Sequence, residues 1–338
     1  MNNITRPHRI AVVIPAYRVK SHVLEVITAI GPEVWRIFVI DDACPESTGD
    51  FVQAHCRDAR VEILRLPQNL GVGGAVMAGY RAGLEAGADV LVKIDGDGQM
   101  DPRLINQFVL PIRQGRADYT KGNRFFSPEM LAGMPVLRLL GNAVLSLVNK
   151  ISSGYWDIFD PTNGYTAIHA RTLALLPLGK ISRRYFFESD MLFRLNTLRA
   201  LVVDIPMHAV YGNETSHLRV QKILIEFLFK HIRNFVKRIF YNYYLRDMSI
   251  ASFELPIGLF LILSGILYGG MNWLYYDSMN VSAPTGTIVL PAMSILAGLQ
   301  LVLAFIQYDI ANVPRTALHL LISDVRVHPP GDYGGPSA

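Results

Sequence analysis

The segment VLVKIDGDGQMDP, residues 90–102, ends an apolar run with acidic and amide side chains at alternating positions. If the chain stays extended there, Asp95, Asp97 and Gln99 project to the same side. Oxygen ligands that converge in this way suit a hard cation such as Mg²⁺ or Mn²⁺, and such an ion typically bridges to phosphates. An EF-hand calcium loop is excluded, because its sixth position would be methionine and its twelfth asparagine. A solvated acidic strand end without a ligand is the alternative interpretation.

The elements that would position these side chains are short runs rich in Val and Ile. The runs IAVVI, WRIFVI, VEILRL and VLVKI lie between residues 10 and 123, separated by helical patterns such as GGAVMAGYRAGLEAG. This alternation predicts βαβ units and a parallel sheet covered by helices on both faces. The polar clusters PAY, DDACPES, PQNLGVGG and DGDGQ each follow one of the runs. Because ligands bind at the carboxyl ends of such strands, we expect these clusters to form one site.

The glycine-rich segment NLGVGGAVMAG invites a dinucleotide-binding interpretation. A G-x-G-x-x-G pattern that starts at Gly71 would need a glycine where Val76 stands. We therefore expect these glycines to permit a tight entry into a helix whose amide groups point towards the site.

The composition predicts that part of the chain lies in lipid. Of the 338 residues 51% are hydrophobic and 18% are charged, which is more apolar than a typical soluble protein. Leu255 to Tyr276 and Ser278 to Tyr308 are uncharged, and each exceeds the roughly 20 residues that a membrane-spanning helix needs. Buried helices of a soluble core are the alternative. The N-terminal residues predict no signal peptide, and Cys44 and Cys56 predict neither a disulfide nor a metal site.

Basic residues flank these two stretches on one side only. Lys230, Arg233, Lys237, Arg238 and Arg246 precede the first stretch, Arg315 and Arg326 follow the second, and the connection DSMNVSAPTG has no Lys or Arg. Since cytoplasmic loops carry the excess of Lys and Arg, both termini and the soluble part are expected on the cytoplasmic side of the inner membrane. The modest net charge of +4 calls for no nucleic-acid partner.

The segment RVQKILIEFLFKHIRNFVKRIFYNYY, residues 219–244, has helical periodicity with two faces. One face collects Ile225, Leu228, Phe229, Ile232, Phe235, Val236, Ile239, Phe240 and Tyr243, and the other collects Lys230, Arg233, Lys237 and Arg238. We expect this helix to lie in the membrane interface with its cations near anionic headgroups. A helix packed on the catalytic domain or on a sister subunit is the alternative.

Seven motifs occur in an order that resembles family 2 glycosyltransferases of the GT-A fold. They are VVIPAY, VIDDACPEST, NLGVGGAVMAGYRAGLEAGADVLVKIDGDGQMDP, GNRF, MPVLRLLGN, DPTNGYTA and FFESDMLFRL, within residues 8–218. The resemblance is strongest to the dolichol-phosphate mannose synthase and polyprenyl-phosphate glycosyltransferase branch, of which one bacterial group also has two C-terminal spans. It implies an α/β fold of the Rossmann-like GT-A type. The implied reaction moves a sugar from a nucleotide diphosphate donor to polyprenyl phosphate with inversion.

The resemblance also implies roles for individual residues. Nucleotide contacts fall to Pro15, Ala16, Tyr17, Asp41, Asp42 and Asp95, metal contacts to Asp95, Asp97 and Gln99, and donor diphosphate and acceptor phosphate contacts to Arg124 and Arg138 respectively. A divalent cation and a guanidinium placed where negative charge develops lower the barrier to departure of the nucleoside diphosphate. The acceptor phosphate needs positioning more than deprotonation. Glu188 and Asp190 are acceptor-side candidates, although capping of a helix explains acidic residues at its start equally well.

Two motifs depart from the family pattern. The family commonly has P-A-Y-N-E where this chain has PAYRVK, so Arg18 and Val19 replace groups near the nucleotide. The later R-x-x-G-x-S-K-L pattern is replaced by YGNETSHL, which puts His217 at the lysine position. One cationic clamp on the phosphates is therefore missing or supplied differently, and His217 is its candidate substitute when protonated.

These observations predict four regions. They are a GT-A catalytic domain at 1–218, a basic amphipathic juxtamembrane region at 219–250, two transmembrane helices with a short extracytoplasmic loop at 251–312, and a cytoplasmic tail at 313–338. The expected enzyme uses Mg²⁺ or Mn²⁺ and a UDP-hexose, with GDP-mannose as the other donor, and serves surface polysaccharide or glycoconjugate assembly. A homo-oligomer is also expected. Two other hypotheses stay open: the same fold acting on another lipid or lipid-linked glycan, and a non-catalytic membrane-anchored scaffold that binds nucleotide sugars.

Overall fold

The computed structural model describes residues 8–127, 136–207 and 220–322, and for residues 137, 138 and 220–224 it describes the backbone alone. The chain divides into two compact units. Unit 1 comprises Met1–Asn234 and Pro314–Ala338, and unit 2 comprises Phe235–Val313. The chain therefore leaves unit 1, forms unit 2 and returns to unit 1.

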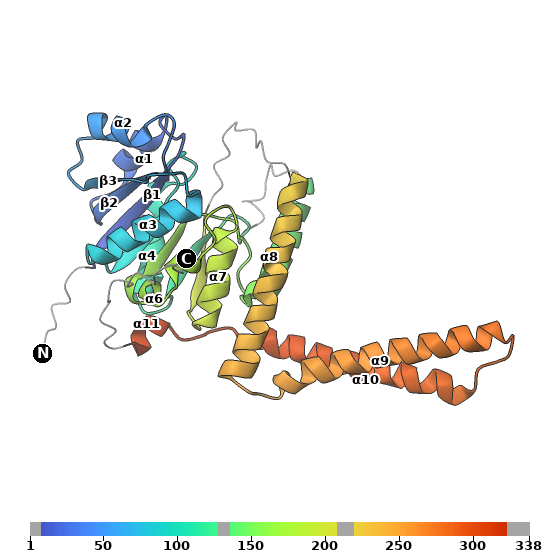
Figure 1. Ribbon diagram of the computed structural model, residues 1–338. Coiled ribbons are helices and arrows are strands. Elements are labelled where there is room, and N and C mark those ends of the chain that lie inside the picture. Colours follow the sequence, from blue (N-terminus) through green and yellow to red (C-terminus); the bar gives the residue numbers. More distant parts are fainter. Residues whose placement is uncertain (1–7, 128–135, 208–219, 323–338) are drawn as a thin grey trace, which may run out of the picture. The chain divides into compact units, whose positions relative to one another are not determined.

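Unit 1 is built on a seven-stranded sheet with the order β3-β2-β1-β4-β6-β5-β7 (Figure 1). The strands are β1 (Ile10–Ala16), β2 (Val34–Asp41), β3 (Val61–Arg65), β4 (Val90–Lys93), β5 (Tyr119–Asn123), β6 (Thr166–His169) and β7 (Val202–Pro206). The four strands predicted from the apolar runs are confirmed, and they pair in parallel. Strand β6 is antiparallel to both β4 and β5, so the complete sheet is mixed.

Helices cover both faces of this sheet, as the sequence predicted. The helices that lie wholly in unit 1 are α1 (Val23–Ala29), α2 (Thr48–His55), α3 (Val72–Glu85), α4 (Ile105–Arg113), α5 (Val136–Ser153), α6 (Ala170–Ala174), α7 (Phe187–Thr197) and α11 (Leu318–Leu321), with short 3-10 turns at Pro102–Leu104 and Leu178–Lys180. Alternate residues of β1 and β4, such as Val12 and Val92, enter a core with α1 and α4. The residues between them, such as Val13 and Leu91, face α3, where Gly79 and Gly83 admit their side chains.

The amino end of α3 explains its glycine-rich sequence. Gly71 has a φ of +81°, a conformation that favours glycine. A Cβ at Gly73 would lie 2.6 Å from Cβ of Phe187, so only glycine permits the close approach of the loop before α7. The amide of Gly74 donates to the carbonyl of Arg183 at 3.0 Å. The tight helix entry is therefore confirmed, and this amide is satisfied by the protein itself.

Helices α5 and α8 (Val220–Phe240) carry apolar stripes on their exposed sides. The exposed residues are Val136, Leu140, Val144, Leu147 and Ile151 on α5, and Ile225, Leu228, Phe229, Ile232, Val236 and Phe240 on α8. On α8 the buried side is polar: His231 Nδ1 lies 2.7 Å from Ser152 Oγ, and Asn234 Nδ2 donates to Asp190 Oδ1 at 3.2 Å. Because Ser152 and Asp190 provide partners for His231 and Asn234 on the inner side, the apolar side of α8 is the one that faces outward.

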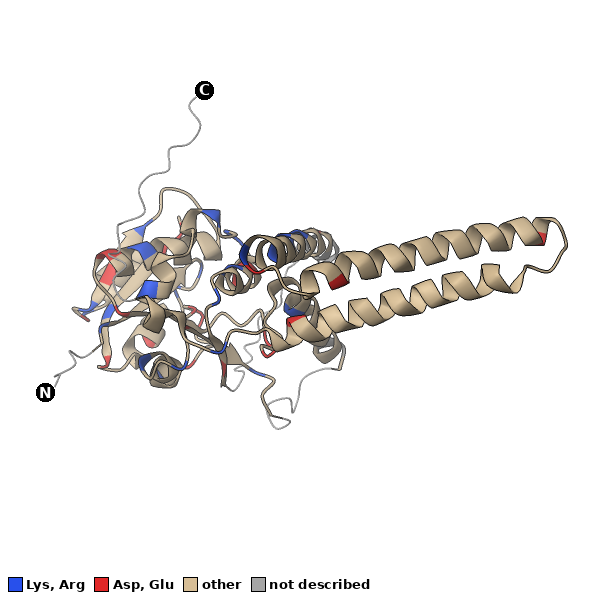
Figure 2. Ribbon diagram, turned by 90° about the horizontal axis from the view of Figure 1, so that it is seen from below, with Lys and Arg blue, Asp and Glu red and all other residues tan. Residues whose placement is uncertain are grey.

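Unit 2 consists mainly of the antiparallel hairpin of α9 (Ala251–Ser278) and α10 (Thr285–Ala311). Both helices are long and apolar enough to cross a membrane. Neither contains Lys or Arg, and their few acidic residues lie near the helix ends (Figure 2). Only 22% and 17% of their most apolar windows is buried, whereas the core helices of a soluble protein are mostly buried. The chain is therefore a membrane-anchored protein.

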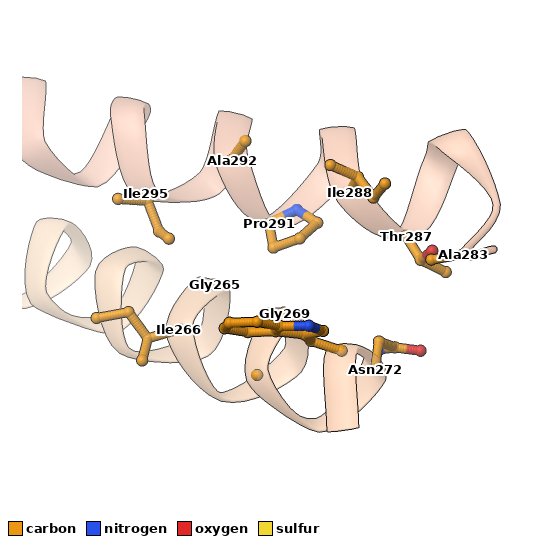
Figure 3. A pocket seen from close by; sticks show the side chains of 12 residues that line it. Gly265, Ile266, Gly269, Asn272, Ala283, Thr287, Ile288, Pro291, Ala292 and Ile295 are labelled. Carbon is orange, nitrogen blue, oxygen red and sulfur yellow. The ribbon is translucent and has the colours of Figure 1, made fainter. Parts of the chain in front are cut away.

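Glycines bring α9 and α10 into contact. A Cβ at Gly258 would lie 2.9 Å from the carbonyl oxygen of Gly298, and a Cβ at Gly265 would lie 2.9 Å from that of Pro291. Such close backbone approach is the usual way in which membrane helices pack. Towards the connecting loop the helices separate around an apolar cavity of about 450 Å³, lined by residues that include Gly269, Ile288 and Pro291 (Figure 3).

A buried ion pair joins the end of α8 to α10 within unit 2. The guanidinium of Arg238 donates to both carboxylate oxygens of Asp309, at 2.6 and 3.0 Å, and the hydroxyl of Tyr243 donates to Asp309 Oδ1 at 2.6 Å. Arg238 is only 2% exposed. The prediction that Arg238 lies on the headgroup-facing side of the helix is therefore wrong, because Asp309 takes up its charge inside the protein. Arg233 and Lys237 are exposed, as predicted.

The segment after α10 returns to unit 1 and docks at the amino end of β5. The fully buried carboxylate of Asp118 accepts hydrogen bonds from the amides of Leu318 and His319 at 2.7 and 2.8 Å. It also lies 2.7 Å from Nδ1 of His319, whose ring stacks on His169 with centroids 4.1 Å apart. The described part of the predicted C-terminal tail is thus an integral piece of unit 1.

Candidate active site

Several of the predicted site residues lie at the carboxyl edge of the sheet. Strands β1, β2, β4 and β5 all run in the same direction, so the segments that follow them emerge at one edge. The loop before the antiparallel strand β6 reaches the same edge from the opposite direction. The topology therefore brings together the PAY, DDACPES, DGDGQ, GNRF and DPTNG segments, as the sequence predicted for the first three.

Asp41 is the last residue of β2, Asp42 follows it, and both are buried. Asp41 accepts from the amides of Cys44 at 2.7 Å and Gly49 at 2.6 Å. Asp42 accepts from the amides of Leu70 at 2.7 Å and Gly71 at 2.8 Å. Both carboxylates thus order the loops at the nucleotide side of the expected site, and the glycine-rich segment is one of those loops.

The PAY segment, residues 15–17, lies at the carboxyl end of β1. Pro15 and Ala16 belong to the strand, and Asp42 N donates to the carbonyl oxygen of Ala16 at 3.2 Å. Tyr17 is 42% exposed, and the guanidinium of Arg18 lies 5.5 Å from the centre of its ring. Arg18 has a φ of +58° and its amide contacts the sulfur of Cys44 at 3.1 Å. The departure from the family motif therefore places an arginine beside the exposed tyrosine ring.

The acidic segment after β4 forms a turn rather than a continued strand. Gly98 has a φ of +79°, and Asp97 Oδ1 accepts from the amide of Gln99 at 3.0 Å. Asp95 is 28% exposed in its side chain and pairs through Oδ1 with the buried ammonium group of Lys93 at 2.7 Å. The expectation that three side chains share one side of an extended chain is therefore wrong, because the turn at Gly98 intervenes.

The chemistry of the Asp95, Asp97 and Gln99 donor set still fits a hard divalent cation. Two carboxylates and a carboxamide offer only oxygen ligands, the kind that Mg²⁺ and Mn²⁺ prefer. Within the described residues, no group of three or more His, Cys, Asp or Glu side chains comes together to hold a metal ion. A cation at this turn would therefore complete its shell with water or with phosphate oxygens of a ligand.

Arg124 follows β5 and is held by Asp160. Its Nε donates to Asp160 Oδ2 at 2.7 Å and its Nη2 to Oδ1 at 2.9 Å, a bidentate pair. Asp160 is 1% exposed. Burial by itself would raise the pKa of Asp160, but the Arg124 guanidinium outweighs it and holds that pKa below the usual range. The pair fixes the guanidinium at the carboxyl edge while a quarter of the arginine side chain stays exposed.

The two acidic residues at the start of α7 have different environments. Asp190 is 1% exposed and accepts from the amide of Ser182 at 2.9 Å, and it also pairs with Arg194 at 3.2 Å. These contacts make Asp190 a structural residue and not an acceptor-side group, which corrects that expectation. Glu188 is half-buried. Burial raises the pKa of Glu188 to about 7, against the opposing effect of the ammonium groups of Lys93 and Lys121.

Two predicted site residues cannot be placed. Arg138 lies in α5, but its side chain is outside the described atoms, and His217 lies outside the described residues. Three other residues at the edge were missed by the sequence reasoning: Lys93, Lys121 and Asp160. A lysine inside the apolar run VLVKI was the one available signal, because a buried lysine needs a partner.

Comparison with known proteins agrees with this fold. The glycosyl transferase family 2 model matches residues 11–173. An undecaprenyl-phosphate mannosyltransferase of Micrococcus luteus is 35% identical over 173 residues, which cover 51% of this chain and 70% of the relative. A UDP-N-acetylglucosamine–dolichyl-phosphate N-acetylglucosaminyltransferase of Methanococcus voltae is 26% identical and is covered over 92% of its length by 64% of this chain.

A solved structure with a similar fold is glucosyl-3-phosphoglycerate synthase of Mycobacterium tuberculosis in complex with UDP. Its TM-score is 0.51 at 19% identity, with 68% of this chain and 80% of that chain covered. The mixed sheet is thus of the GT-A type. The chain belongs to glycosyl transferase family 2. The two relatives are named as enzymes that transfer sugars to undecaprenyl or dolichyl phosphate.

Proposed function

We propose that this protein transfers a hexosyl group, with inversion, from a nucleotide diphosphate donor to polyprenyl phosphate at the cytoplasmic face of the inner membrane. The observation that carries the proposal is the carboxyl edge of the sheet in unit 1. There the Asp95–Asp97 turn follows β4, Arg124, which pairs with Asp160, follows β5, and Glu188 interacts electrostatically with Asp95. Helices α5 and α8 expose apolar stripes. Such an edge suits a charged donor, and such stripes suit a lipid acceptor.

On the donor side, the residues act by positioning and by charge. Asp41 and Asp42 order the loops beside Tyr17, where the nucleotide would bind. Asp95, Asp97 and Gln99 would hold Mg²⁺ or Mn²⁺, which would stabilise charge on the departing diphosphate. The structurally similar synthase has also been solved with Mn²⁺ and UDP-glucose. Arg124, fixed by Asp160, directs positive charge to the same leaving group.

On the acceptor side, the phosphate of a polyprenyl phosphate is already largely ionised near neutral pH. It therefore needs to be positioned, and we assign this role to Arg138. Glu188 lies at the same edge, and with a pKa of about 7 it is partly protonated near neutral pH. In that form its carboxyl group can donate a hydrogen bond to a phosphate oxygen.

The membrane keeps the acceptor close to this unit. The hairpin of α9 and α10 anchors the chain, and the exposed stripes of α5 and α8 would enter the headgroup and acyl boundary. The exposed cations Arg233 and Lys237 on α8 lie beside its stripe, where they can contact anionic headgroups. This arrangement supports a product that remains in the membrane for surface polysaccharide or glycoconjugate assembly.

The donor remains to be chosen by experiment. We propose a UDP-hexose, and the relative from Methanococcus voltae is named for a UDP sugar. The relative from Micrococcus luteus is named for mannose transfer, which makes GDP-mannose the other donor to test.

The proposal is tested with purified full-length protein in detergent, undecaprenyl phosphate, Mg²⁺ or Mn²⁺, and radiolabelled UDP, GDP and dTDP sugars. Label is counted after extraction into organic solvent. We expect label in the lipid from one donor, and none with Asp97→Ala protein or after chelation of the metal. A folded preparation that binds nucleotide sugars without labelling this lipid would indicate a different acceptor. A folded preparation that binds none would leave a non-catalytic scaffold.

A further inference from the structure

A row of polar side chains crosses the sheet beneath the proposed site. Lys93 of β4 pairs in register with Thr166 of β6, Thr166 pairs with Lys121 of β5, and Lys121 pairs with Asp204 of β7. Residues that pair in register lie on the same face of a sheet. Lys93 and Lys121 are each 1% exposed. Two lysines are thus buried on one face of the strands whose ends carry the site.

The two lysines have different partners. Lys93 Nζ lies 2.7 Å from Asp95 Oδ1, whereas Lys121 Nζ donates to the carbonyl oxygen of Asn163. Lys93 therefore contacts a residue of the proposed donor site, and Lys121 contacts the backbone of the loop before β6. Both sit near Glu188, so the face has anionic charge to compensate them.

Gly164 makes room for the pair of Lys93 and Asp95. A Cβ at Gly164 would overlap Lys93 Nζ and would lie 2.9 Å from Asp95 Oδ2. The loop before β6 thus packs directly against the pair. The buried ammonium group of Lys93 and the close backbone of Gly164 together restrict the orientation of the Asp95 carboxylate.

We propose that Lys93 is a positioning residue for the donor site: its ammonium group fixes Asp95 Oδ1, so that Asp95 engages the donor and its cation through Oδ2. This inference rests on the proposed function and deepens it. A carboxylate held by one oxygen has a single orientation before the ligand arrives, which removes an ordering cost from binding. Groups that orient metal ligands in this way typically change metal affinity about 10- to 100-fold when they are removed.

Three variants of the full-length protein in detergent test the inference. Lys93→Met removes the ammonium group, and Gly164→Ala keeps it but displaces it from Asp95. Lys121→Met is the matched control, because it removes an equally buried lysine from the same face without touching Asp95. Melting temperatures identify the conditions under which each variant is folded, and the binding of Mn²⁺ is then measured by electron paramagnetic resonance, alone and with UDP or GDP.

We expect Lys93→Met and Gly164→Ala to weaken nucleotide-dependent Mn²⁺ binding about tenfold or more, and to raise the donor KM more than they lower kcat. Lys121→Met should bind Mn²⁺ within about twofold of the unsubstituted protein, whatever its loss in melting temperature. Unchanged or tighter Mn²⁺ binding by folded Lys93→Met protein would overturn the inference, as would an equal loss in Lys121→Met. If the unsubstituted protein bound no Mn²⁺ with any nucleotide, the proposed function itself would fail.

Discussion

Charged side chains that are buried or partly buried pair with one another and with polar groups at the carboxyl edge. Asp160 fixes Arg124, Lys93 fixes Asp95, and Asp204 accepts from Asn123 Nδ2 at 2.8 Å. A buried charge whose partner is removed is costly, since it keeps its desolvation penalty and loses the compensating attraction. Substitutions at these positions should therefore affect stability as well as activity.

Asp160→Asn should destabilise unit 1 by about 3 kcal/mol, because it leaves the guanidinium of Arg124 without its bidentate partner in a mostly buried setting. The measurement is urea unfolding of the detergent-solubilised protein. Glu62→Gln is the matched control: its pair with Arg36 has side chains 50% and 42% exposed, so it should cost about 0 to 1 kcal/mol. Equal effects of the two substitutions would contradict the structural role assigned to Asp160.

The stability of the Asp204→Asn variant, relative to that of the unsubstituted protein, should increase as the pH rises. Burial raises the pKa of Asp204 to about 6, above its value of roughly 4 in an unfolded chain. A raised carboxyl pKa means that ionisation destabilises the folded state. The stability that the protein has while Asp204 is protonated is therefore lost progressively from about pH 4 to pH 7. Between pH 4 and pH 8, the difference in unfolding free energy between variant and unsubstituted protein should shift by about 2 to 3 kcal/mol in favour of the variant.

The control for this pH series is Asp58→Asn. A hydrogen bond from Arg60 lowers the pKa of Asp58, so its ionised form stabilises the folded state and this stabilisation is lost as the pH falls through the folded pKa. The control variant should therefore become relatively less stable as the pH rises. A pH series in which Asp204→Asn followed the same direction as Asp58→Asn would show that Asp204 is ionised without cost.

At the scale of elements, sequence periodicity identified the helices and strands but not always the side that is buried. The four apolar runs became β1 to β4. Strands β1, β2 and β4 are mostly buried, and strands buried on both faces read as continuous apolar runs. The two faces of α8 were also recognised, yet Arg238, which was assigned to the face with the exposed cations, lies inside. Periodicity separates two faces of a helix, and which face turns inward depends on polar partners such as Ser152 and Asp309, far away in the sequence.

The stability of the hairpin of α9 and α10 should depend on glycine only at positions where the two helices are in contact. A Cβ at Gly298 would lie 2.6 Å from the carbonyl oxygen of Gly258, so Gly298→Leu must push the helices apart and should destabilise the hairpin by about 1 to 3 kcal/mol. Gly270→Leu is the control in α9, since nothing lies within 4 Å of its Cβ position. Thermal unfolding in detergent should separate the two variants, and equal melting temperatures would contradict this packing.

At the scale of the whole molecule, unit 1 includes the segment that follows the membrane hairpin. Asp118 and His319 are 201 residues apart in the sequence, and no local pattern relates them. The sequence therefore suggested a free tail from residue 313 onward, although the motifs of the site itself were recognisable because each follows a predicted strand. Pairing across such a separation is decided by burial and hydrogen bonding in the folded chain, which a linear sequence does not display.

Truncation should show whether this return segment is part of the fold. A chain that ends at Val313 loses the donors of Leu318 and His319 to Asp118, and leaves Thr172 Oγ1 and the amide of Leu201 as described donors to a fully buried carboxylate. Unit 1 should then lose about 3 kcal/mol or more of unfolding free energy, measured in urea, while a chain that ends at Ile322 keeps these donors and should match the full-length protein.

The substitution Asp118→Asn should destabilise the full chain. It should cost much less in the chain that ends at Val313, because it removes the charge that the truncation leaves unsatisfied. Identical unfolding of the two truncated chains would mean that the return segment rests on unit 1 without stabilising it.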